Sequence, residues 1–408
     1  MTLQKQSLYL YTYYFMWKKT LTWKALTPDA ILGKQKAFQQ CQIPGKINLT
    51  LGEFVSPQNI SELYQFQVVQ KATTSFISKS LDHRYLPIAG NSEFLKLHKR
   101  IVVPSLPKGK EEEILGYQTI SGTGALKLTD FILTKLQCNN LFYPKITWAN
   151  HLQIYASQSL ISYCRLDIIQ FLESQKIHSN SAILIQAGCD NPTGHVYSSG
   201  EISQIVKLLD KHRNNVLPVI DNAYQGLASG NYRKDAQLMS ELYQNKIPFM
   251  VASSCAKNLG LYGQRVGSLM IYFPDSLTQY QNINDHITKL IRSQYSSPPK
   301  MGALIAQTVW EQHGEDWEKE CNALAEYLIN IRKALSDSLF HLGVVSPGLL
   351  EGRGMFYLSD LTPLQVAYLE KKYGIFVLDN GRMNLAGLPM DKISFVAEKM
   401  KEAMMEAG

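Results

Sequence analysis

Lys257 and Arg265 stand in a segment that suits a reactive amine. Residues 253–260 read Ser-Ser-Cys-Ala-Lys-Asn-Leu-Gly and follow the apolar run 247–252, and Arg265 comes eight residues after the lysine. The small neighbours leave room for a bulky group on the lysine amine. A lysine that loses solvation in such a pocket has a lowered pKa and attacks carbonyl groups. An ordinary surface lysine explains this segment equally well on its own, so the assignment depends on the rest of the chain.

Polar turns follow three apolar runs of strand length. These are the run 182–185 before Asn191, the run 216–220 before Asp221 and the run 249–252 before Lys257. Continuous apolar strands indicate a parallel sheet that is covered on both faces. Ser198 and Glu201 have capping-box spacing, which predicts a helix start between the first two runs. Because the carboxyl ends of parallel strands share one edge of a sheet, an amide, a carboxylate and an amine are expected to lie together there.

A glycine-rich turn upstream is a candidate phosphate cradle. Residues 121–125, Ser-Gly-Thr-Gly-Ala, follow the strand-like run 117–120 and begin a helix-like stretch. Glycines let backbone N–H groups approach a phosphate, and a helix N-terminus favours an anion. The turn matches neither GxGxxG nor the P-loop pattern, and alone it is explained by a structural turn. Together with Ser254 and Arg265 as further donors, it predicts a monophosphate site.

The composition argues against several other classes of protein. The 408 residues suggest one large or two modest domains, and the net charge of +7 comes from scattered basic residues, so nucleic-acid binding has no support. The nine histidines form no HExxH or related cluster, which argues against a bound metal. The six cysteines contain no CxxC pair and predict free thiols in a reducing compartment, so we expect a cytoplasmic protein.

The N-terminal segment is rich in aromatic residues. Residues 8–17 form an apolar run that is too short to span a bilayer, and it lacks the strong basic start and the cleavage site of a signal peptide. We therefore expect no membrane association. A simpler hypothesis is that Met16 is the true first residue and that residues 1–15 come from upstream translation.

A nucleophilic lysine, a carboxylate and a monophosphate cradle together describe a site for pyridoxal 5′-phosphate (PLP). In such a site Lys257 bonds the cofactor as a Schiff base, and Asp221 keeps the pyridine nitrogen protonated. Asn191 is placed to hydrogen-bond the phenolic oxygen of the cofactor. Trp148 is the candidate for stacking on the ring, although a tryptophan in the core explains that residue as well.

The chain resembles class I aminotransferases of the aspartate/aromatic group, which have the fold type I PLP architecture. The resemblance extends from about Pro28 to the C-terminus and follows the motif order of the family. Its motifs are residues 28–33, 85–88, 121–125, 148–151, 191–194, 221–226 and 257–262, Arg292 with 295–299, and residues 381–384. The agreement of so many separate motifs in one order identifies the chain as a member of this family.

The resemblance implies a role for each site residue. Lys257 is the Schiff-base lysine and general base, Asp221 pairs with the pyridinium, and Tyr224 contacts the phenolic oxygen. The expected cofactor contacts are Gly122, Thr123, Trp148, Asn191, Asp221, Tyr224, Ser254, Lys257, Arg265 and, from a second subunit, Tyr85. The expected substrate contacts are Gly52, Trp148, Asn191, Arg382 for the α-carboxylate and, from the second subunit, Arg292 for a distal carboxylate. His151 is expected behind Asp221.

The fold that the resemblance implies is α/β, with a large PLP domain, whose mostly parallel seven-stranded sheet lies between helices, and a smaller α/β domain. The expected divisions are residues 1–25 as an N-terminal extension, 26–61 as the first segment of the small domain, 62–322 as the large PLP-binding domain and 323–408 as the C-terminal small domain. Apolar residues from Leu324 to Leu339 at helical spacing predict a helix that bridges toward the C-terminal part. Because the site draws on two chains, a homodimer is required.

The resemblance also implies ping-pong transfer of an amino group between aspartate or glutamate and 2-oxo acids. Arg292 favours dicarboxylate substrates. Ser297 favours aromatic amino acids as well, because aspartate-selective members usually have asparagine there; drift at a tolerant position is the alternative. The rival hypotheses are another reaction on this fold, such as that of a diaminopimelate aminotransferase, lyase or decarboxylase, and a non-catalytic PLP-binding regulator.

Three features depart from the family pattern. Ala256 replaces a serine that contacts phosphate in many members, so lower cofactor affinity is expected. Gln186 replaces a frequent histidine near Asp221, which leaves the surroundings of that carboxylate open. The segment between Trp148 and Asn191 is shorter than usual. None of these changes removes a group that the chemistry requires.

Overall fold

The computed structural model describes residues 30–56, 62–77, 82–164, 167–174, 177 and 179–407. The expected extension 1–25 and the hypothesis on Met16 lie outside these residues. The helices are α2 (Ala30–Gln40), α3 (Gln67–Ile77), α4 (Ser92–Val102), α5 (Ser121–Lys135), α6 (Asn150–Ile154), α7 (Ile168–Glu173), α8 (Ser199–Lys211), α9 (Tyr232–Asp235), α10 (Gln237–Gln244), α11 (Tyr280–Tyr295), α12 (Lys300–Gln312), α13 (Gly314–His341), α14 (Pro347–Glu351), α15 (Pro363–Tyr373) and α16 (Ile393–Glu406). The strands are β1 (Ile47–Asn48), β2 (Leu115–Ile120), β3 (Asn140–Pro144), β4 (Leu160–Tyr163), β5 (Ser181–Gln186), β6 (Val216–Asn222), β7 (Phe249–Ser254), β8 (Val266–Tyr272), β9 (Phe356–Leu358), β10 (Ile375–Phe376) and β11 (Arg382–Asn384).

The large part of the molecule is built on a seven-stranded sheet with the strand order β2-β8-β7-β6-β5-β3-β4. β8 runs antiparallel to both of its neighbours, and the other neighbouring pairs are parallel. This arrangement confirms the predicted mostly parallel seven-stranded sheet. The three apolar runs that predict strands lie in β5, β6 and β7, which are neighbours at the centre of the sheet.

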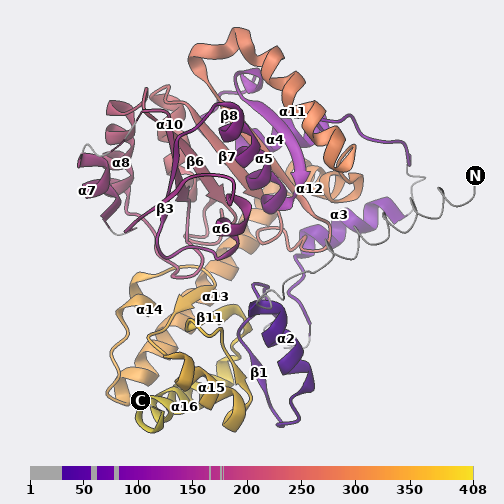
Figure 1. Ribbon diagram of the computed structural model, residues 1–408. Helices are drawn as coiled ribbons and strands as arrows, with labels where there is room; N and C mark the ends of the chain where they lie inside the picture. The colour runs from indigo at the N-terminus through magenta and orange to yellow at the C-terminus, as the bar shows by residue number, and fades with distance from the viewer. Residues whose placement is uncertain are drawn as a thin grey trace, which may run out of the picture.

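Both faces of the central strands are covered. In β5, Ile183 and Ile185 pack in one core cluster with Ile205 of α8. The alternate residues Ala182 and Leu184 belong to a second cluster, to which α5 and α11 contribute. In Figure 1, α5 lies in front of the central strands. Because side chains alternate between the two faces of a strand, burial on both faces requires the continuous apolar runs that the sequence shows.

The helix predicted after the Asn191 turn is α8, and its start is fixed by a capping box. Ser198 Oγ accepts a hydrogen bond from the Glu201 backbone N–H at 3.3 Å, and the Glu201 carboxylate accepts one from the Ser198 backbone N–H at 2.8 Å. These two bonds satisfy donors that the first turn of a helix otherwise leaves free. The predicted capping box is therefore confirmed.

The part of the molecule below the sheet in Figure 1 combines segments from both ends of the described chain. β1 pairs with β10 in parallel, and β9 pairs with β11 in antiparallel orientation. The long helix α13 joins this part to the rest: Trp317 and Leu324 belong to a core of the large part, whereas Leu335 and Leu339 belong to the core around β1 and β10. The helix predicted from apolar spacing is therefore present and enters both cores.

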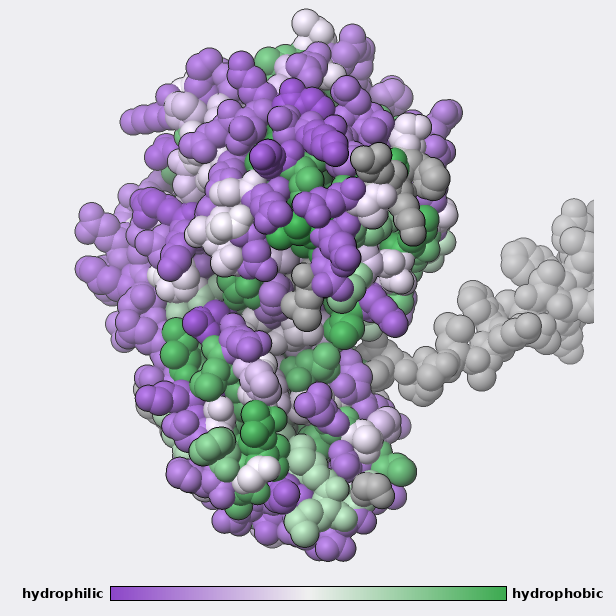
Figure 2. Space-filling view, turned by 90° about the vertical axis from the view of Figure 1, so that its left-hand side faces the viewer, coloured by the Kyte–Doolittle hydropathy of each residue, from purple (hydrophilic) through white to green (hydrophobic). Residues whose placement is uncertain are grey.

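The surface differs between the two parts. Figure 2 shows polar side chains over most of the upper part of one face, and more hydrophobic side chains over the lower part. The exposed large hydrophobic side chains of the C-terminal segment include Phe340, Val345, Leu350 and Leu364. Within the described ranges, no helix is both long enough and apolar enough to cross a membrane.

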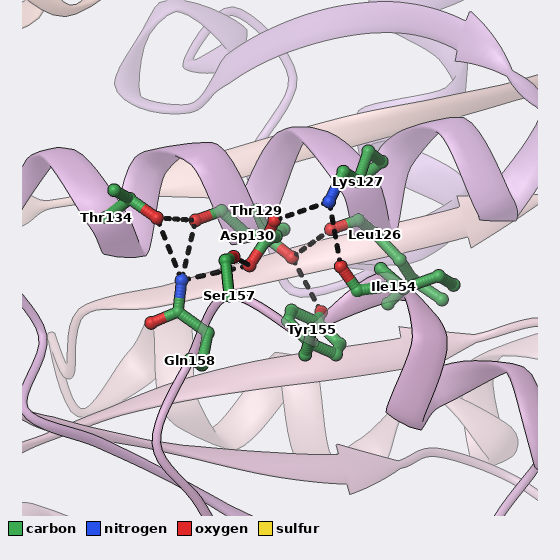
Figure 3. A network of polar contacts seen from close by, with 9 residues as sticks. All are labelled: Leu126, Lys127, Thr129, Asp130, Thr134, Ile154, Tyr155, Ser157 and Gln158. Atoms are coloured by element: carbon green, nitrogen blue, oxygen red, sulfur yellow. Dashed lines mark hydrogen bonds and ion pairs between the residues drawn. The ribbon is translucent and has the colours of Figure 1, made fainter. Parts of the chain in front are cut away.

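A polar network fastens α5 to the segment that follows α6 (Figure 3). The buried Asp130 carboxylate accepts hydrogen bonds from Ser157 Oγ at 2.7 Å and from Gln158 Nε2 at 2.9 Å. It also pairs with Lys127 Nζ at 2.7 Å, and the same ammonium donates to the Ile154 carbonyl at 2.9 Å. These donors compensate the cost of burying a charge. The network joins α5, which begins at the predicted phosphate cradle, to α6, which follows the predicted ring-stacking tryptophan.

We predict that Asp130→Ala lowers the apparent free energy of unfolding in urea by about 2–4 kcal/mol, because several donors lose a charged acceptor at once. Asp337→Ala is the matched control, since Asp337 is exposed on α13; it should change stability by no more than about 0.5 kcal/mol. Equal losses for the two variants would show that the network does not hold α5 in place.

Candidate active site

A cavity of about 350 Å³ lies where β5, β6 and β7 end. The strand register explains its position, because Gln186 of β5 lies opposite Asp221 of β6, and Asp221 lies opposite Ala252 of β7. The predicted site residues that line the cavity are Gly52, Gly122, Thr123, Trp148, Asn191, Asp221, Tyr224, Ser254, Lys257, Arg265 and Arg382. Residues from separate motifs therefore meet in one place.

Lys257 follows β7 and lines this cavity. Its Nζ lies 4.6 Å from the centroid of the Tyr262 ring. Burial lowers the pKa of the Lys257 amine to about 8; the Glu53 carboxylate raises this pKa, and the guanidinium groups of Arg265 and Arg382 lower it. A neutral amine is the nucleophilic form of lysine, so a lowered pKa makes more of that form available near neutral pH.

Asp221, in β6, is held from behind by a histidine. His151 Nε2 lies 3.1 Å from Asp221 Oδ2, and both side chains are buried. His151 Nδ1 lies 2.8 Å from Thr147 Oγ1, so both ring nitrogens are engaged. Such a chain of hydrogen bonds fixes the orientation of the imidazole and, through it, the position of the carboxylate. The structure thus places His151 where the resemblance implies it.

Gln186 completes the surroundings of Asp221. Its side-chain amide donates to the Asn191 carbonyl at 3.3 Å, and its Oε1 accepts a hydrogen bond from Thr147 Oγ1 at 3.2 Å. The glutamine therefore links the turn that carries Asn191 to the residue that orients His151. The place that the family pattern often gives to histidine is here occupied by a buried amide with partners on both sides.

The glycine-rich turn forms the N-terminus of α5, as predicted. Among the described residues none caps this terminus with a side chain, so the N–H groups of its first turn offer donors to an anion. Ser121 Oγ lies 3.0 Å from Ser254 Oγ, which accepts the Ala256 N–H at 3.2 Å. A Cβ built on Gly122 would lie 3.2 Å from Ser254 Cβ. A larger residue at Gly122 would therefore crowd the space between α5 and Ser254.

Arg382, in β11, presents a buried guanidinium to the cavity. It donates to Asn191 Oδ1 at 3.2 Å and to the Thr50 carbonyl, and its Nε has no hydrogen-bond partner in the described structure. The guanidinium carbon lies 4.6 Å from the Phe356 ring centroid. Burial lowers the pKa of Arg382 to about 10. A buried guanidinium without a carboxylate partner favours the binding of an incoming carboxylate.

Two predicted site residues lie apart from this cavity. Tyr85 is 89% exposed, and Arg292 is exposed near the end of α11. Neither of them contributes to the lining that the described residues form. Their predicted roles require a second subunit and remain predictions.

Glu53 and Phe356 also line the cavity and were not predicted from the sequence. Phe356 lies opposite Asn384 in the pairing of β9 with β11. Asn384 is two residues from Arg382 along β11. No local pattern in the sequence indicates that pairing. Glu53 follows Gly52 directly, so its place beside a predicted substrate contact was the signal that could have found it.

Comparisons with known proteins agree with this geometry. The family model for aminotransferase class I and II matches residues 44–400. Aspartate aminotransferase 1 of Medicago sativa is 32% identical over 388 residues, which cover 90% of this chain and 91% of that protein.

Solved structures of similar proteins cover nearly the whole chain. The cytoplasmic aspartate aminotransferase of Saccharomyces cerevisiae has a TM-score of 0.88 and 28% identity, and the match covers 95% of this chain and 98% of that one. The broad specificity aminotransferase of Leishmania mexicana has a TM-score of 0.87 and 26% identity, with 96% and 99% coverage. Together with the family match, these likenesses show that the chain belongs to the class I and II aminotransferases.

Proposed function

We propose that this chain is a PLP-dependent aminotransferase that moves an amino group between aspartate or glutamate and 2-oxo acids by a ping-pong mechanism, with aromatic amino acids as further substrates. The observation that carries the proposal is the meeting of Lys257, Asp221 and Arg382 at one cavity. They supply an amine of lowered pKa, a carboxylate and a carboxylate-binding guanidinium. The named activities of the yeast and Medicago sativa proteins support the proposal.

The lining of the cavity fits PLP. When bound, PLP supplies an aldehyde that bonds amines and a ring that accepts the electron pair left at the substrate Cα. The uncapped start of α5 and the space that Gly122 leaves beside Ser254 suit its phosphate. We assign the phosphate to Gly122, Thr123, Ser254 and Arg265, the ring nitrogen to Asp221, the phenolic oxygen to Asn191 and Tyr224, and the ring face to Trp148.

Lys257 is the residue that moves the proton. When PLP is bound, Lys257 would be the residue that holds it covalently, through Nζ. The Lys257 amine, when free, would act as the general base that removes the proton from the substrate Cα and then as the acid that returns it. Only the neutral amine accepts a proton, so the lowering of the Lys257 pKa by burial serves this step.

Asp221 and Arg382 hold the two ends of the reacting system. Asp221 keeps a proton on the ring nitrogen, and the contacts of His151 with Asp221 and Thr147 fix the carboxylate that does so. Arg382 binds the substrate α-carboxylate through its planar fork, aided by the backbone of Gly52. The Asn191 and Thr50 contacts already hold the guanidinium in place, so little ordering is needed when substrate binds.

A homodimer completes the proposed site. Tyr85 and Arg292 are exposed on the described chain, and we assign Tyr85 to the cofactor phosphate and Arg292 to the distal carboxylate of a substrate in the neighbouring subunit. Arginine suits this task because two parallel N–H donors match one carboxylate.

We further propose that residues 26–61 and 323–408 form the small domain and residues 62–322 the large one. The two separate cores along α13 support a division within that helix, although Leu324 and Leu328 still pack in the core of the large part. The six cysteines are all free thiols, which favours a reducing compartment, and we propose the cytoplasm.

The proposed substrate range includes phenylalanine and tyrosine. Ser297 supports this breadth through the family pattern, and a solved relative with 26% identity is described as a broad specificity aminotransferase.

We predict that Lys257→Ala retains bound cofactor but loses turnover by at least about 10³-fold, because the nucleophile and the general base are one group. Cofactor content measured by absorbance and steady-state kinetics check this prediction. A small primary amine such as methylamine should restore part of the rate. Substantial turnover of the variant without added amine would refute the role of Lys257.

We predict that Arg292→Ala lowers kcat/KM for aspartate by about 30–1000-fold and changes that for phenylalanine far less, because only aspartate has a distal carboxylate to lose its partner. Lys289→Ala on the same helix is the control, since Lys289 is also exposed and basic. Equal effects of Arg292→Ala on both substrates would exclude recognition of the distal carboxylate.

A further inference from the structure

One charged group of the cavity lining has no role in the proposed function. The charged residues that line the cavity are Glu53, Asp221, Lys257, Arg265 and Arg382. Asp221, Lys257 and Arg265 are assigned to the cofactor, and Arg382 is assigned to the substrate α-carboxylate. The cofactor and the substrate α-carboxylate therefore already have charged partners in the cavity. The Glu53 carboxylate is the charged group of the lining that is left without an assigned role.

The backbone around Glu53 is held in place by long-range contacts. Its carbonyl accepts a hydrogen bond from Asn384 Nδ2 at 2.7 Å, and the N–H of the next residue, Phe54, donates to Tyr262 Oη at 2.9 Å. A Cβ built on Gly52 would lie 3.1 Å from Phe356 Cζ and 3.9 Å from Lys257 Nζ. Glu53 therefore belongs to a short fixed segment that packs against the reacting end of the cavity.

The Glu53 side chain is half-buried. Within the described residues its carboxylate makes no hydrogen bond and no ion pair, although its charge acts on Lys257 and raises the pKa of that amine against the effect of burial. Apolar side chains, including Leu51 and Phe356, share the lining. A partly desolvated carboxylate among such neighbours gains free energy when a cationic donor reaches it and loses free energy when a second carboxylate does.

We propose that Glu53 determines substrate specificity by binding the side-chain ammonium or guanidinium of an amino acid substrate. Ornithine, lysine and arginine are the amino acids of this class, and dicarboxylates are disfavoured by the same charge. The inference rests on the proposed function, because it takes the α-carboxylate to lie at Arg382 and the reacting amine near Lys257. It adds a cationic class to the proposed substrates and limits the efficiency with aspartate.

The first test compares kcat/KM for ornithine and for aspartate in the wild-type enzyme and in Glu53→Gln, which keeps the shape and removes the charge. We expect the variant to lose about tenfold with ornithine and to gain about tenfold with aspartate, since one charge-assisted hydrogen bond is lost and one repulsion is relieved. Glu398→Gln on α16 is the matched control, because Glu398 is exposed and the change in net charge is the same. It should leave the ratio of the two values unchanged.

The second test measures binding without turnover. In the pyridoxamine form of the holoenzyme, an added amine does not react, so calorimetry with 4-aminobutanoate and with glutarate reports binding alone. These ligands share one terminal carboxylate and differ in the charge at the other end. Glu53→Gln should weaken 4-aminobutanoate and strengthen glutarate, each by about tenfold. If the variant loses its fold by circular dichroism, Glu53→Ala takes its place with the same expectation.

Two results overturn this inference. An unchanged ratio of ornithine to aspartate in Glu53→Gln would show that the carboxylate does not meet the substrate side chain. Weaker glutarate binding in the variant would show that Glu53 instead orients Arg292, the arginine that is proposed to bind the distal carboxylate. Failure of the proposed function is distinguishable, because the wild-type holoenzyme would then transfer no amino group from any amino acid.

Discussion

The parallel alignment of β5, β6 and β7 is the constraint on which the site depends. The register sets Gln186, Asp221 and Ala252 side by side, so the turns with Asn191 and Lys257 begin at the same edge as Asp221. A slip of one residue would turn Asp221 to the other face of the sheet. The alternating apolar residues of these strands, which pack on α8 and α5, prevent such a slip because it would expose both cores. The packing of the core thereby fixes where Asp221 and the turns with Asn191 and Lys257 lie.

The cavity is electrostatically prepared for anions. Lys257, Arg265 and Arg382 line it, and none of the three forms an ion pair with another described residue. Burial lowers the pKa of Lys257 and of Arg382, because holding these cations away from water costs free energy. A phosphate and a carboxylate that bind there offset this cost, so ligands should stabilise the folded protein. Asp221 and Glu53 balance part of the positive charge. Asp221 is buried against His151 and is assigned to the cofactor ring, whereas Glu53 is half-buried and is assigned to the substrate side chain.

The sequence predicted the features that depend on local patterns. Apolar runs, a capping box and helical spacing identified the central strands, α8 and α13. The polar turns identified Asn191, Asp221 and Lys257, whereas Gly52, Tyr224 and Arg382 came only from the family resemblance. Phe356 was not predicted because its place depends on the pairing of β9 with β11, two segments that are distant in the sequence. Glu53 had a local signal in its neighbour Gly52, but its backbone is fixed by a contact between distant segments, the Phe54–Tyr262 hydrogen bond across 208 residues. The sequence also did not predict the contacts of Gln186 near Asp221. The hydrogen bonds of Gln186 with Thr147 and with Asn191 join segments that are separate in the sequence. Tyr85 and Arg292 require a second chain, so one chain cannot place them.

The half-reaction is the most direct test of the account. The purified PLP form is mixed with aspartate, and in a separate sample with phenylalanine, while the absorbance of the cofactor is followed. We predict conversion to the pyridoxamine form with both amino acids and release of one equivalent of the matching 2-oxo acid. The absence of any spectral change with either amino acid would contradict this prediction.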